Sequence, residues 1–308
     1  MKRVGLVGGR GYVGRELITL LAGHGGIEIA WVTSSTHGGD SVASTAPIST
    51  LNFEQARPSL LSTSPVDAVV LALPNGDSDP WVSAARAEQY IVDLSCDHRF
   101  DASWIYGLPE RHRDQLHGAT RIANPGCYAT AIQAAIGPLV PLLDGPVHAF
   151  GVSGYSGAGT SKGPRNDPKV LEDNLLPYAL TEHTHEREVT QKLGHPVFFM
   201  PHVASFFRGL SVTMSVTFSE PQTHSAVTEL YRAAFCRESL VRLTDDAPLV
   251  RDARDRHFVN VGGLTLSHDG KHAVIVSTLD NLLGGAATTA LRNLNLAMGF
   301  PEFEGIVK

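Results

Sequence analysis

The chain has 308 residues, of which 43% are hydrophobic and 18% charged, a composition that is typical of a folded globular protein and excludes intrinsic disorder. This length exceeds what a single hydrophobic core usually organises, so we expect two domains. The net charge is −6 and no long basic run is present, which argues against nucleic acid as a partner.

The first part of the chain alternates short apolar strands with amphipathic helical patterns. Strands are expected at residues 4–7, 27–32, 68–73 and 90–94, and helices at residues 14–22 and 82–87. Such alternation is typical of parallel strands joined by helices. It predicts an α/β fold class with a Rossmann-type doubly wound parallel sheet.

The pattern changes after Cys127. A helix of small apolar residues is expected at 128–140, followed by β-branched or alternating strands at 197–200, 210–218 and 273–277. These strands predict a second, α+β catalytic domain with a mostly antiparallel sheet. A last helix at 286–298 is expected to pack on the N-terminal domain. We therefore assign residues 1–126 and 285–308 to a dinucleotide-binding domain, and 127–284 to a catalytic and oligomerisation domain.

Three glycines, Gly8, Gly11 and Gly14, lie between the first strand and the first helix. Glycines permit a tight turn there and let backbone N–H groups at the helix N-terminus approach a pyrophosphate, whose charge the helix dipole favours. The alternative is a glycine-rich turn without a ligand. The position of the motif inside a strand–helix–strand unit favours dinucleotide binding.

The second strand ends in residues 33–37, Thr-Ser-Ser-Thr-His, without the carboxylate that would hold the ribose of NAD. The hydroxyl groups of Ser34 and Ser35 and the guanidinium of Arg10 suit a 2′-phosphate instead. NADP (NADPH) is therefore the expected cofactor, the alternative being a solvated Ser/Thr turn.

Cys127 follows Pro125-Gly126 at the expected start of a helix, where the helix dipole favours a thiolate. We predict that it is the catalytic nucleophile, and that Cys96 and Cys236 are small apolar residues without a role in the chemistry. Three cysteines without a Cys-x-x-Cys spacing suit a reducing compartment. No signal peptide or apolar run of about 18 residues is seen, so the protein is expected in the cytoplasm, away from the membrane.

Two further segments carry polar groups suited to a site. Residues 153–163 are rich in glycine and hydroxyl side chains and include Lys162, so they could hold an anion or form a flexible loop. His183 and His185 lie in the run Glu-His-Thr-His-Glu. Without a distant partner this run is weak support for a metal, and none is expected, whereas one imidazole acting as general acid/base is favoured over a histidine without a role.

Several motifs together resemble one family. They are the glycine loop, the string Asn124-Pro125-Gly126-Cys127-Tyr128, the Tyr-Gly-Leu-Pro-Glu run at 106–110 and the loop at 153–159. Taken together they are similar to the N-acetyl-γ-glutamyl-phosphate reductases of arginine biosynthesis, and the resemblance runs from Val4 to Ala286, over nearly the whole chain. The resemblance implies NADPH-dependent reduction of N-acetyl-γ-glutamyl phosphate to N-acetylglutamate semialdehyde through a thioester on Cys127.

The resemblance also implies roles for individual residues. His183 and His185 would supply the acid/base group, and we favour His185 for proton transfer and His183 for positioning. Further residues are expected to bind the cofactor or the substrate. The cofactor set is Gly8, Arg10, Gly11, Tyr12, Val13, Gly14, Ser34, Ser35 and Asn281, and the substrate set is Arg99, Ser153, Ser156, Gly157, Lys162 and Arg208.

The chain departs from the family pattern at Thr160, where the family commonly has arginine, and at Gly284, where it commonly has lysine. Lys162 or Arg165 is expected to supply the missing cation beside the anionic substrate. The alternatives are a reductase of carrier-bound aminoadipyl phosphate in lysine synthesis, an aspartate-semialdehyde or glyceraldehyde-3-phosphate dehydrogenase, and a dinucleotide-binding sensor that is not an enzyme. The second domain is expected to pair through its sheet, giving a homodimer or homotetramer.

Overall fold

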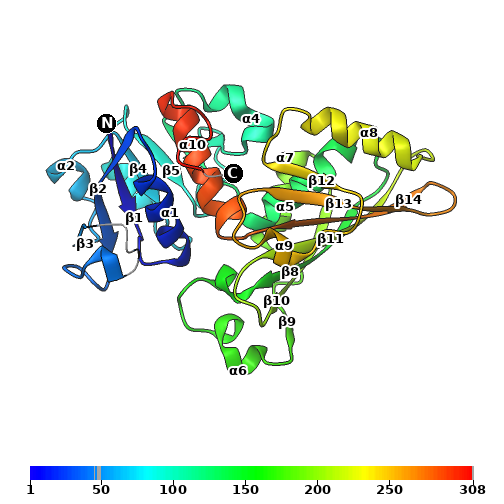
Figure 1. The fold of residues 1–308 in the computed structure, drawn as a ribbon, viewed down its shortest axis with the longest axis horizontal. Coiled ribbons are helices and arrows are strands. Elements are labelled where there is room, and N and C mark those ends of the chain that lie inside the picture. Colours follow the sequence, from blue (N-terminus) through cyan, green and yellow to red (C-terminus); the bar gives the residue numbers. More distant parts are fainter. Residues whose placement is uncertain (45, 47–49, 307–308) are drawn as a thin grey trace. The chain divides into compact units, whose positions relative to one another are not determined.

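The computed structural model describes residues 1–44, 46 and 50–306 (Figure 1). The chain divides into two compact units. The first unit comprises Met1–Gly126 and Ala286–Lys308, and the second unit comprises Cys127–Gly285.

The first unit contains a seven-stranded sheet with the order β3-β2-β1-β4-β5-β7-β6, in which every pair of neighbours is parallel. The strands are β1 (Lys2–Val7), β2 (Ile27–Ser34), β3 (Phe53–Gln55), β4 (Ala68–Leu71), β5 (Tyr90–Asp93), β6 (Ile105–Tyr106) and β7 (Arg121–Ala123). Strand β4 is apolar at every position because all four of its residues are buried, as expected for a strand covered on both faces of the sheet. The predicted doubly wound parallel sheet is confirmed.

The helices of the first unit are α1 (Tyr12–Ala22), η1 (Val42–Ser44), α2 (Leu60–Thr63), α3 (Asp79–Ala84), α4 (Pro109–Leu116) and α10 (Thr288–Met298). The prediction for residues 82–87 was wrong in its bounds. Pro80 lies in the first turn, where a missing N–H costs nothing, so α3 begins at Asp79, and the extended backbone of Ala85 ends it.

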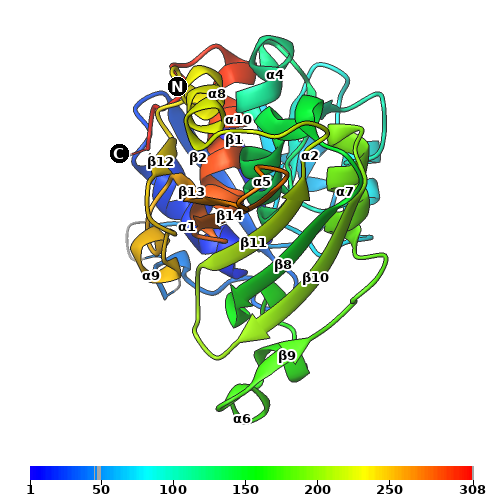
Figure 2. The same cartoon turned by 90° about the vertical axis from the view of Figure 1, so that its right-hand side faces the viewer.

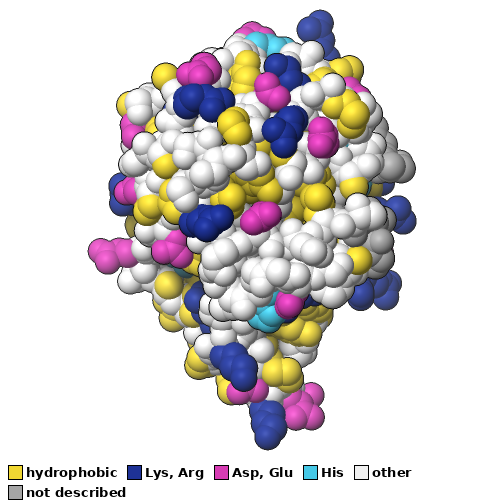
Figure 3. Space-filling model, turned by 90° about the vertical axis from the view of Figure 1, so that its left-hand side faces the viewer, with side chains coloured by type: hydrophobic (Ala, Val, Ile, Leu, Met, Phe, Trp, Pro, Cys, Tyr) yellow, Lys and Arg dark blue, Asp and Glu magenta, His cyan; other side chains and the backbone are white. Residues whose placement is uncertain are grey.

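The C-terminal helix α10 completes the first unit. It packs against α1, α4 and β5 (Figure 1), so the prediction that this helix returns to the N-terminal sheet is confirmed. The π-helical turn η5 (Leu283–Ala287) precedes it, where the sequence pattern predicted one continuous helix from residue 286. Arg292 of α10 is buried and paired with Glu110 and Glu302, which keeps its charge compensated. On the face drawn in Figure 3, basic and acidic side chains are interspersed.

The second unit contains a seven-stranded mixed sheet with the order β12-β13-β14-β11-β8-β10-β9. Its strands are β8 (Val147–Gly154), β9 (Leu175–Pro177), β10 (Val197–Ala204), β11 (Leu210–Thr217), β12 (Val241–Thr244), β13 (Val259–Leu266) and β14 (His272–Leu279). Most neighbours are antiparallel, as predicted, but β10 runs parallel to β8 and β12 runs parallel to β13. The parallel pairing of β10 follows from the long crossover that separates it from β8.

The helices of the second unit are α5 (Cys127–Ile136), η2 (Gly137–Leu142), η3 (Tyr155–Ala158), η4 (Pro164–Asn166), α6 (Pro168–Leu171), α7 (Thr184–Leu193), α8 (His224–Phe235) and α9 (Val250–Ala253). The predicted helix at 128–140 begins as expected but changes to a 3-10 helix after Ile136. Pro138 and Pro141 lack the N–H groups that would continue the α-helical bonding.

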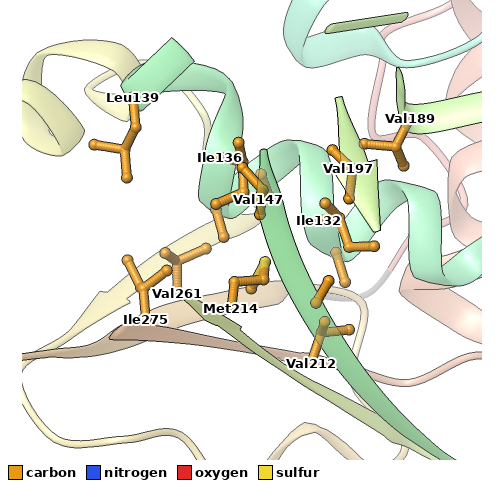
Figure 4. Close-up of a cluster of buried hydrophobic side chains, with 14 of the residues drawn as sticks. Ile132, Ile136, Leu139, Val147, Val189, Val197, Val212, Met214, Val261 and Ile275 are labelled. Carbon is orange, nitrogen blue, oxygen red and sulfur yellow. The ribbon is translucent and has the colours of Figure 1, made fainter. Parts of the chain in front are cut away.

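Helix α5 forms the core of the second unit by packing on one face of the sheet. Ile132 and Ile136 of α5 point toward Val147, Val212 and Ile275 on the strands (Figure 4). The opposite face of β8, β10 and β11 carries the alternate residues of each strand. Figure 2 shows these strands side by side in front of α5 and α7.

Candidate active site

The glycine loop between β1 and α1 is packed so tightly at Gly8 and Gly14 that neither position has room for a side chain. Gly8 has φ +81°, and a Cβ on it would lie 2.2 Å from the carbonyl oxygen of Ala72. A Cβ on Gly14 would lie 2.4 Å from the oxygen of Gly8. Thr33 of β2 fixes the turn, because its Oγ1 accepts from Gly8 N at 3.3 Å and its carbonyl accepts from Gly9 N at 3.1 Å.

This loop leads into the partly buried N-terminal end of α1, where the helix dipole is positive. Gly11 is the N-cap of α1 and offers no side-chain acceptor, and the first turn contains no acidic residue. The first turn of a helix directs backbone N–H groups outward along the helix axis, and Val13 and Gly14 lie in that turn of α1. A loop that a Cβ would fill, ending at such a helix terminus, fits a dinucleotide pyrophosphate.

The residues predicted to hold a 2′-phosphate have different local roles. Ser34 is buried, and its Oγ accepts from the backbone N–H groups of Thr36 and His37 at 3.3 and 3.1 Å, so it caps the turn. Ser35 is exposed, and Arg10 is partly exposed with its Nη1 4.0 Å from Asp40 Oδ2. Asp40 was not predicted from the sequence, because it lies beyond residues 33–37 at the end of the second strand. It places a carboxylate beside Arg10.

Arg99 in the first unit is predicted to contact substrate, and two of its hydrogen bonds are to backbone carbonyls of the same unit. It is 6% exposed, and it donates through Nε to the carbonyl of Asn124 at 2.9 Å and through Nη2 to that of Leu94 at 2.9 Å. These bonds support the turn at Asn124 and Pro125. Substrate binding by Arg99 stays a prediction.

Cys127 is the first residue of α5, as the Pro-Gly turn predicted. It is partly buried, packs against the core of the second unit and forms no disulfide. Gly285 lies against it, because a Cβ on Gly285 would stand 2.5 Å from the Cβ of Cys127. The thiol therefore sits at a helix N-terminus with the backbone of residue 285 packed behind it.

His183 and His185 are brought together by the start of α7. His183 is the N-cap, and its Nδ1 accepts from the backbone N–H of His185 at 3.0 Å. The two ring centroids lie 4.8 Å apart. Burial, helped by the positive charge of Arg165, lowers the pKa of His183 to about 4, so this ring is neutral at pH 7.

Aromatic side chains connect these histidines with the start of α5. The ring of Tyr128 lies 5.9 Å from that of His185, and the ring of Tyr178 lies 5.5 Å from that of His183. Burial raises the pKa of Tyr178, and the charge of Cys127 raises it further, which places the phenol within electrostatic range of the nucleophile. Sequence reasoning missed Tyr178, because a lone tyrosine in a polar loop gives no pattern.

Glu186 anchors the histidine segment to the sheet. Its Oε2 accepts from Phe199 N of β10 at 2.8 Å, and its Oε1 accepts from Glu182 N at 3.0 Å. Glu182 has φ +59°, a left-handed conformation that is rare for a residue with a side chain. The bonds from Glu186 hold this turn and thereby the position of His183.

The loop after β8 uses its backbone donors within the second unit. The N–H groups of Gly154, Tyr155 and Ser156 donate to carbonyls of residues 206–209. Ser153 and Ser156 are buried. Gly157 packs close to Ser153, because a Cβ on Gly157 would come within 3.3 Å of Ser153 Oγ. The expected anion cradle is thus not made by the N–H groups of residues 154–156.

Asn281 and Arg208, predicted for cofactor and substrate, both have partners within the second unit. Asn281 accepts from Gly209 N at 2.7 Å and donates to Ser156 Oγ at 2.9 Å. Arg208 pairs with the fully buried Asp280, with 2.7 Å between Nε and Oδ2 and 3.0 Å between Nη2 and Oδ1. Asp280 also accepts from Leu282 N, so this network shapes the turn that leads to Gly285. Direct contact with ligands stays a prediction for both.

The described ranges 1–44, 46 and 50–306 contain neither a metal-binding cluster nor a membrane-spanning helix. No set of three or more His, Cys, Asp or Glu side chains is arranged to hold a metal ion there. None of the helices in those ranges has the length and apolar character needed to cross a membrane.

Comparison with known proteins gives consistent matches over the whole chain. The family model described as "Semialdehyde dehydrogenase, NAD binding domain" matches residues 3–119, and "Semialdehyde dehydrogenase, dimerisation domain" matches residues 127–281. The N-acetyl-gamma-glutamyl-phosphate reductase of Xanthomonas oryzae pv. oryzae is 47% identical, covering 98% of each chain. That of Stenotrophomonas maltophilia is 48% identical, covering 98% of this chain and 97% of the relative.

A solved structure matches the fold at low sequence identity. Aspartate semialdehyde dehydrogenase II complexed with ASA from Vibrio cholerae has a TM-score of 0.79 and 17% identity, covering 97% of this chain and 98% of that chain. This likeness shows the fold alone.

Proposed function

The chain belongs to the N-acetyl-γ-glutamyl-phosphate reductase family, and from this premise we propose that it reduces N-acetyl-γ-glutamyl phosphate to N-acetylglutamate semialdehyde through a thioester on Cys127, a step of arginine biosynthesis. The observation that carries the mechanism is Cys127 at the first position of α5 with the histidine pair nearby.

Cys127 begins the reaction as the nucleophile. The dipole of α5 favours the thiolate, which attacks the acyl carbon; the C–O bond to the phosphate then breaks, and inorganic phosphate leaves with that electron pair. The product is a thioester on Sγ. Backbone N–H groups at the start of α5 are the candidate donors to the oxyanion that forms on the way.

The glycine loop of the first unit fits NADPH, with Gly8, Arg10, Gly11 and residues 12–14 as the groups that would hold it. When bound, NADPH supplies the hydride that takes the thioester to the oxidation level of an aldehyde. His185 then accepts the proton from the thiohemiacetal oxygen as this species breaks down to the aldehyde and the thiolate of Cys127.

The different surroundings of the two imidazoles support this division of roles. His183 is neutral at pH 7, and its Nδ1 is already engaged by His185 N, so it suits a fixed positioning group better than a proton carrier. A general acid/base works best with a pKa near the working pH, far from the lowered pKa of His183. We therefore assign proton transfer to His185.

We propose NADPH rather than NADH as the preferred reductant. Arg10 is a partly exposed guanidinium at the glycine loop, and Ser35 offers an exposed hydroxyl at the end of β2. Both suit a 2′-phosphate. Asp40 opposes this preference, because its carboxylate lies 4.0 Å from Arg10 and would repel a phosphate.

The outer face of the second sheet supports a homodimer, or a homotetramer made by pairing dimers. Phe150 is 39% exposed, Phe198 51% and Val274 39%, on β8, β10 and β14. Large apolar side chains exposed on one face of a sheet are typical of a surface that is covered in an assembly. The matching family model is itself described as a dimerisation domain.

Light scattering on the purified protein tests this assembly. Phe198→Glu is expected to yield monomers, since it buries a charge in the pairing face. Leu249→Glu is the matched control, because Leu249 is 49% exposed but lies outside that face, and it should leave the assembly unchanged. Equal masses for wild type and Phe198→Glu would contradict the proposal.

A cytoplasmic location is part of the same proposal. Cys96, Cys127 and Cys236 form no disulfide, and free thiols are typical of proteins in a reducing compartment.

Phosphate-dependent oxidation of aldehydes with NADP⁺ tests the function directly. We expect a kcat/KM for N-acetylglutamate semialdehyde at least about 100-fold above those for aspartate semialdehyde and carrier-bound aminoadipate semialdehyde. Preference for either other aldehyde would transfer the assignment to that substrate. Nucleotide binding without turnover of any of the three would favour the sensor.

A further inference from the structure

Two cations lie in the loop after β8 without a carboxylate to neutralise them. Lys162 and Arg165 are both exposed, and no ion pair is formed by either within the described part of the chain. Some other arginines of this protein are paired with carboxylates, as Arg208 is with Asp280 and Arg292 is with Glu110. In a chain with a net charge of −6, two uncompensated cations three residues apart indicate a place for an anion.

The backbone that carries these cations is held in one conformation by Asn166. Its Nδ2 donates to the carbonyls of Gly159 at 3.0 Å and Ser161 at 2.7 Å, and its Oδ1 accepts from Gly163 N at 2.9 Å. These bonds close the loop from both sides of Lys162. A cation on a braced loop loses less entropy when it binds a ligand than one on a flexible loop.

Only Arg165 is connected to the catalytic side chains. Its guanidinium lies 4.9 Å from the ring centroid of Tyr178, whose ring is 5.5 Å from that of His183. His183 in turn lies 4.8 Å from His185. Lys162 forms no comparable contact with this cluster in the described ranges, so the two cations are not equivalent.

We infer that Arg165, braced by Asn166 and stacked on Tyr178, binds the α-carboxylate of the acyl-phosphate substrate and thereby determines its specificity. A guanidinium takes a carboxylate through two parallel hydrogen bonds, which fixes both charge and orientation. This inference rests on the proposed function. It assigns to Arg165 the cation that the family pattern places at residue 160, where this chain has threonine.

The carboxylate fits better than the phosphate as the anion. The phosphate is attached directly to the acyl carbon that Cys127 attacks, whereas the α-carboxylate lies four C–C bonds away, about 5 Å in an extended chain. Arg165 is separated from His183 by the ring of Tyr178, so it suits the more distant anion. The positive charge of Arg165 also helps to lower the pKa of His183, which shows that its field reaches the catalytic cluster.

Two aldehydes that differ only in this carboxylate provide the test. N-acetylglutamate semialdehyde carries it, and acetamidobutanal, its decarboxylated analogue, does not. In phosphate-dependent oxidation with NADP⁺, Arg165→Met should raise KM for the first aldehyde by about 10- to 100-fold while leaving its kcat within a factor of about three. KM for acetamidobutanal and for phosphate should not change. Arg165→Lys, which keeps the charge but loses the planar fork, should fall between.

Lys169→Met is the matched control, because Lys169 is an exposed cation four residues further along, on α6. It should reproduce wild-type kinetics with both aldehydes. Equal losses for both aldehydes in Arg165→Met, or a raised KM for phosphate alone, would overturn the inference while the proposed function stands. A wild-type enzyme that oxidises neither aldehyde would overturn the proposed function and this inference together.

Discussion

The glycine loop of the first unit and the cysteine–histidine cluster of the second unit are built in opposite ways. The loop is one continuous stretch, residues 8–14, in which the backbone forms most of the site and sterics exclude a side chain at Gly8 and Gly14. The cluster is assembled from α5, the start of α7 and the segment around Tyr178, held by side-chain bonds such as those of Glu186. Defects in the loop should therefore affect nucleotide affinity, and defects in the cluster should affect the chemistry.

Substitutions of the two histidines are expected to show the largest difference between an effect on the chemistry and an effect on nucleotide affinity. His185→Asn should lower kcat by about 100-fold and flatten one limb of the pH–rate profile, because it removes the proton-transfer group. His183→Asn keeps a residue suited to an N-cap and should mainly raise KM. Wild-type kcat and pH dependence in both variants would show that the acid/base group lies elsewhere, with His202 as the next candidate. Nucleotide affinity should stay unchanged in each.

A steric change in the glycine loop should have the reverse signature. Gly14→Ala places a Cβ within 2.4 to 2.8 Å of the backbone of Gly8 and Gly9, so the loop must shift. We expect the Kd for NADPH to rise about tenfold or more, measured by fluorescence titration. Alkylation of Cys127 by iodoacetamide should keep its wild-type rate.

Gly23→Ala, at the C-terminal end of α1 and outside the glycine loop, is the control for this experiment. A Cβ on Gly23 would have its nearest neighbour at 3.6 Å, an ordinary contact, so the affinity should change by less than about threefold. Equal effects of the two substitutions would show that sterics do not shape this site.

The charges around Arg10 should set the choice of cofactor. We expect kcat/KM with NADPH to exceed that with NADH by about tenfold or more, a preference that Arg10→Ala reduces. Asp40→Asn should increase the preference, because it removes the carboxylate 4.0 Å from Arg10. Equal kcat/KM values for the two cofactors in the wild type would refute this reading of the loop.

The smallest expected effect is on stability, through His183. Its pKa is lowered to about 4 in the folded chain, against 6.5 ordinarily, so the unfolded chain binds more protons between these pH values. The unfolding free energy should therefore fall as the pH drops from about 7 to about 5. Urea denaturation should show that His183→Asn loses on the order of 1 kcal/mol less over this interval than the wild type. An identical pH dependence would contradict the lowered pKa.

The contrast between the two regions also explains how far the sequence was informative. The glycine loop and the Pro-Gly turn before Cys127 are local, and both have the conformations that the residues predicted. The hydrogen bonds of Arg208 to Asp280 and of Asn281 to Gly209 each join residues that are 72 positions apart in the sequence. No local sequence pattern predicts such contacts.

The same limit applies to the histidines and the sheet. The spacing of His183 and His185 does not fix the conformation of their segment, whereas the structure shows that His183 is the N-cap of α7 and that its ring accepts a hydrogen bond from the backbone N–H of His185. The parallel pairing of β10 with β8 depends on the crossover between them rather than on strand composition.

Trapping the acyl-enzyme tests the central claim most directly. Incubating the protein with N-acetyl-γ-glutamyl phosphate in the absence of NADPH should increase its intact mass by one N-acetylglutamyl group, located on Cys127 by peptide mapping. Adding NADPH should remove the group and release the semialdehyde. Cys127→Ser should form no thioester and should lose about 1,000-fold or more of its turnover, because a hydroxyl without an adjacent base is a poor nucleophile. Reduction at the wild-type rate by Cys127→Ser, or an adduct on Cys96 or Cys236 instead, would contradict the account.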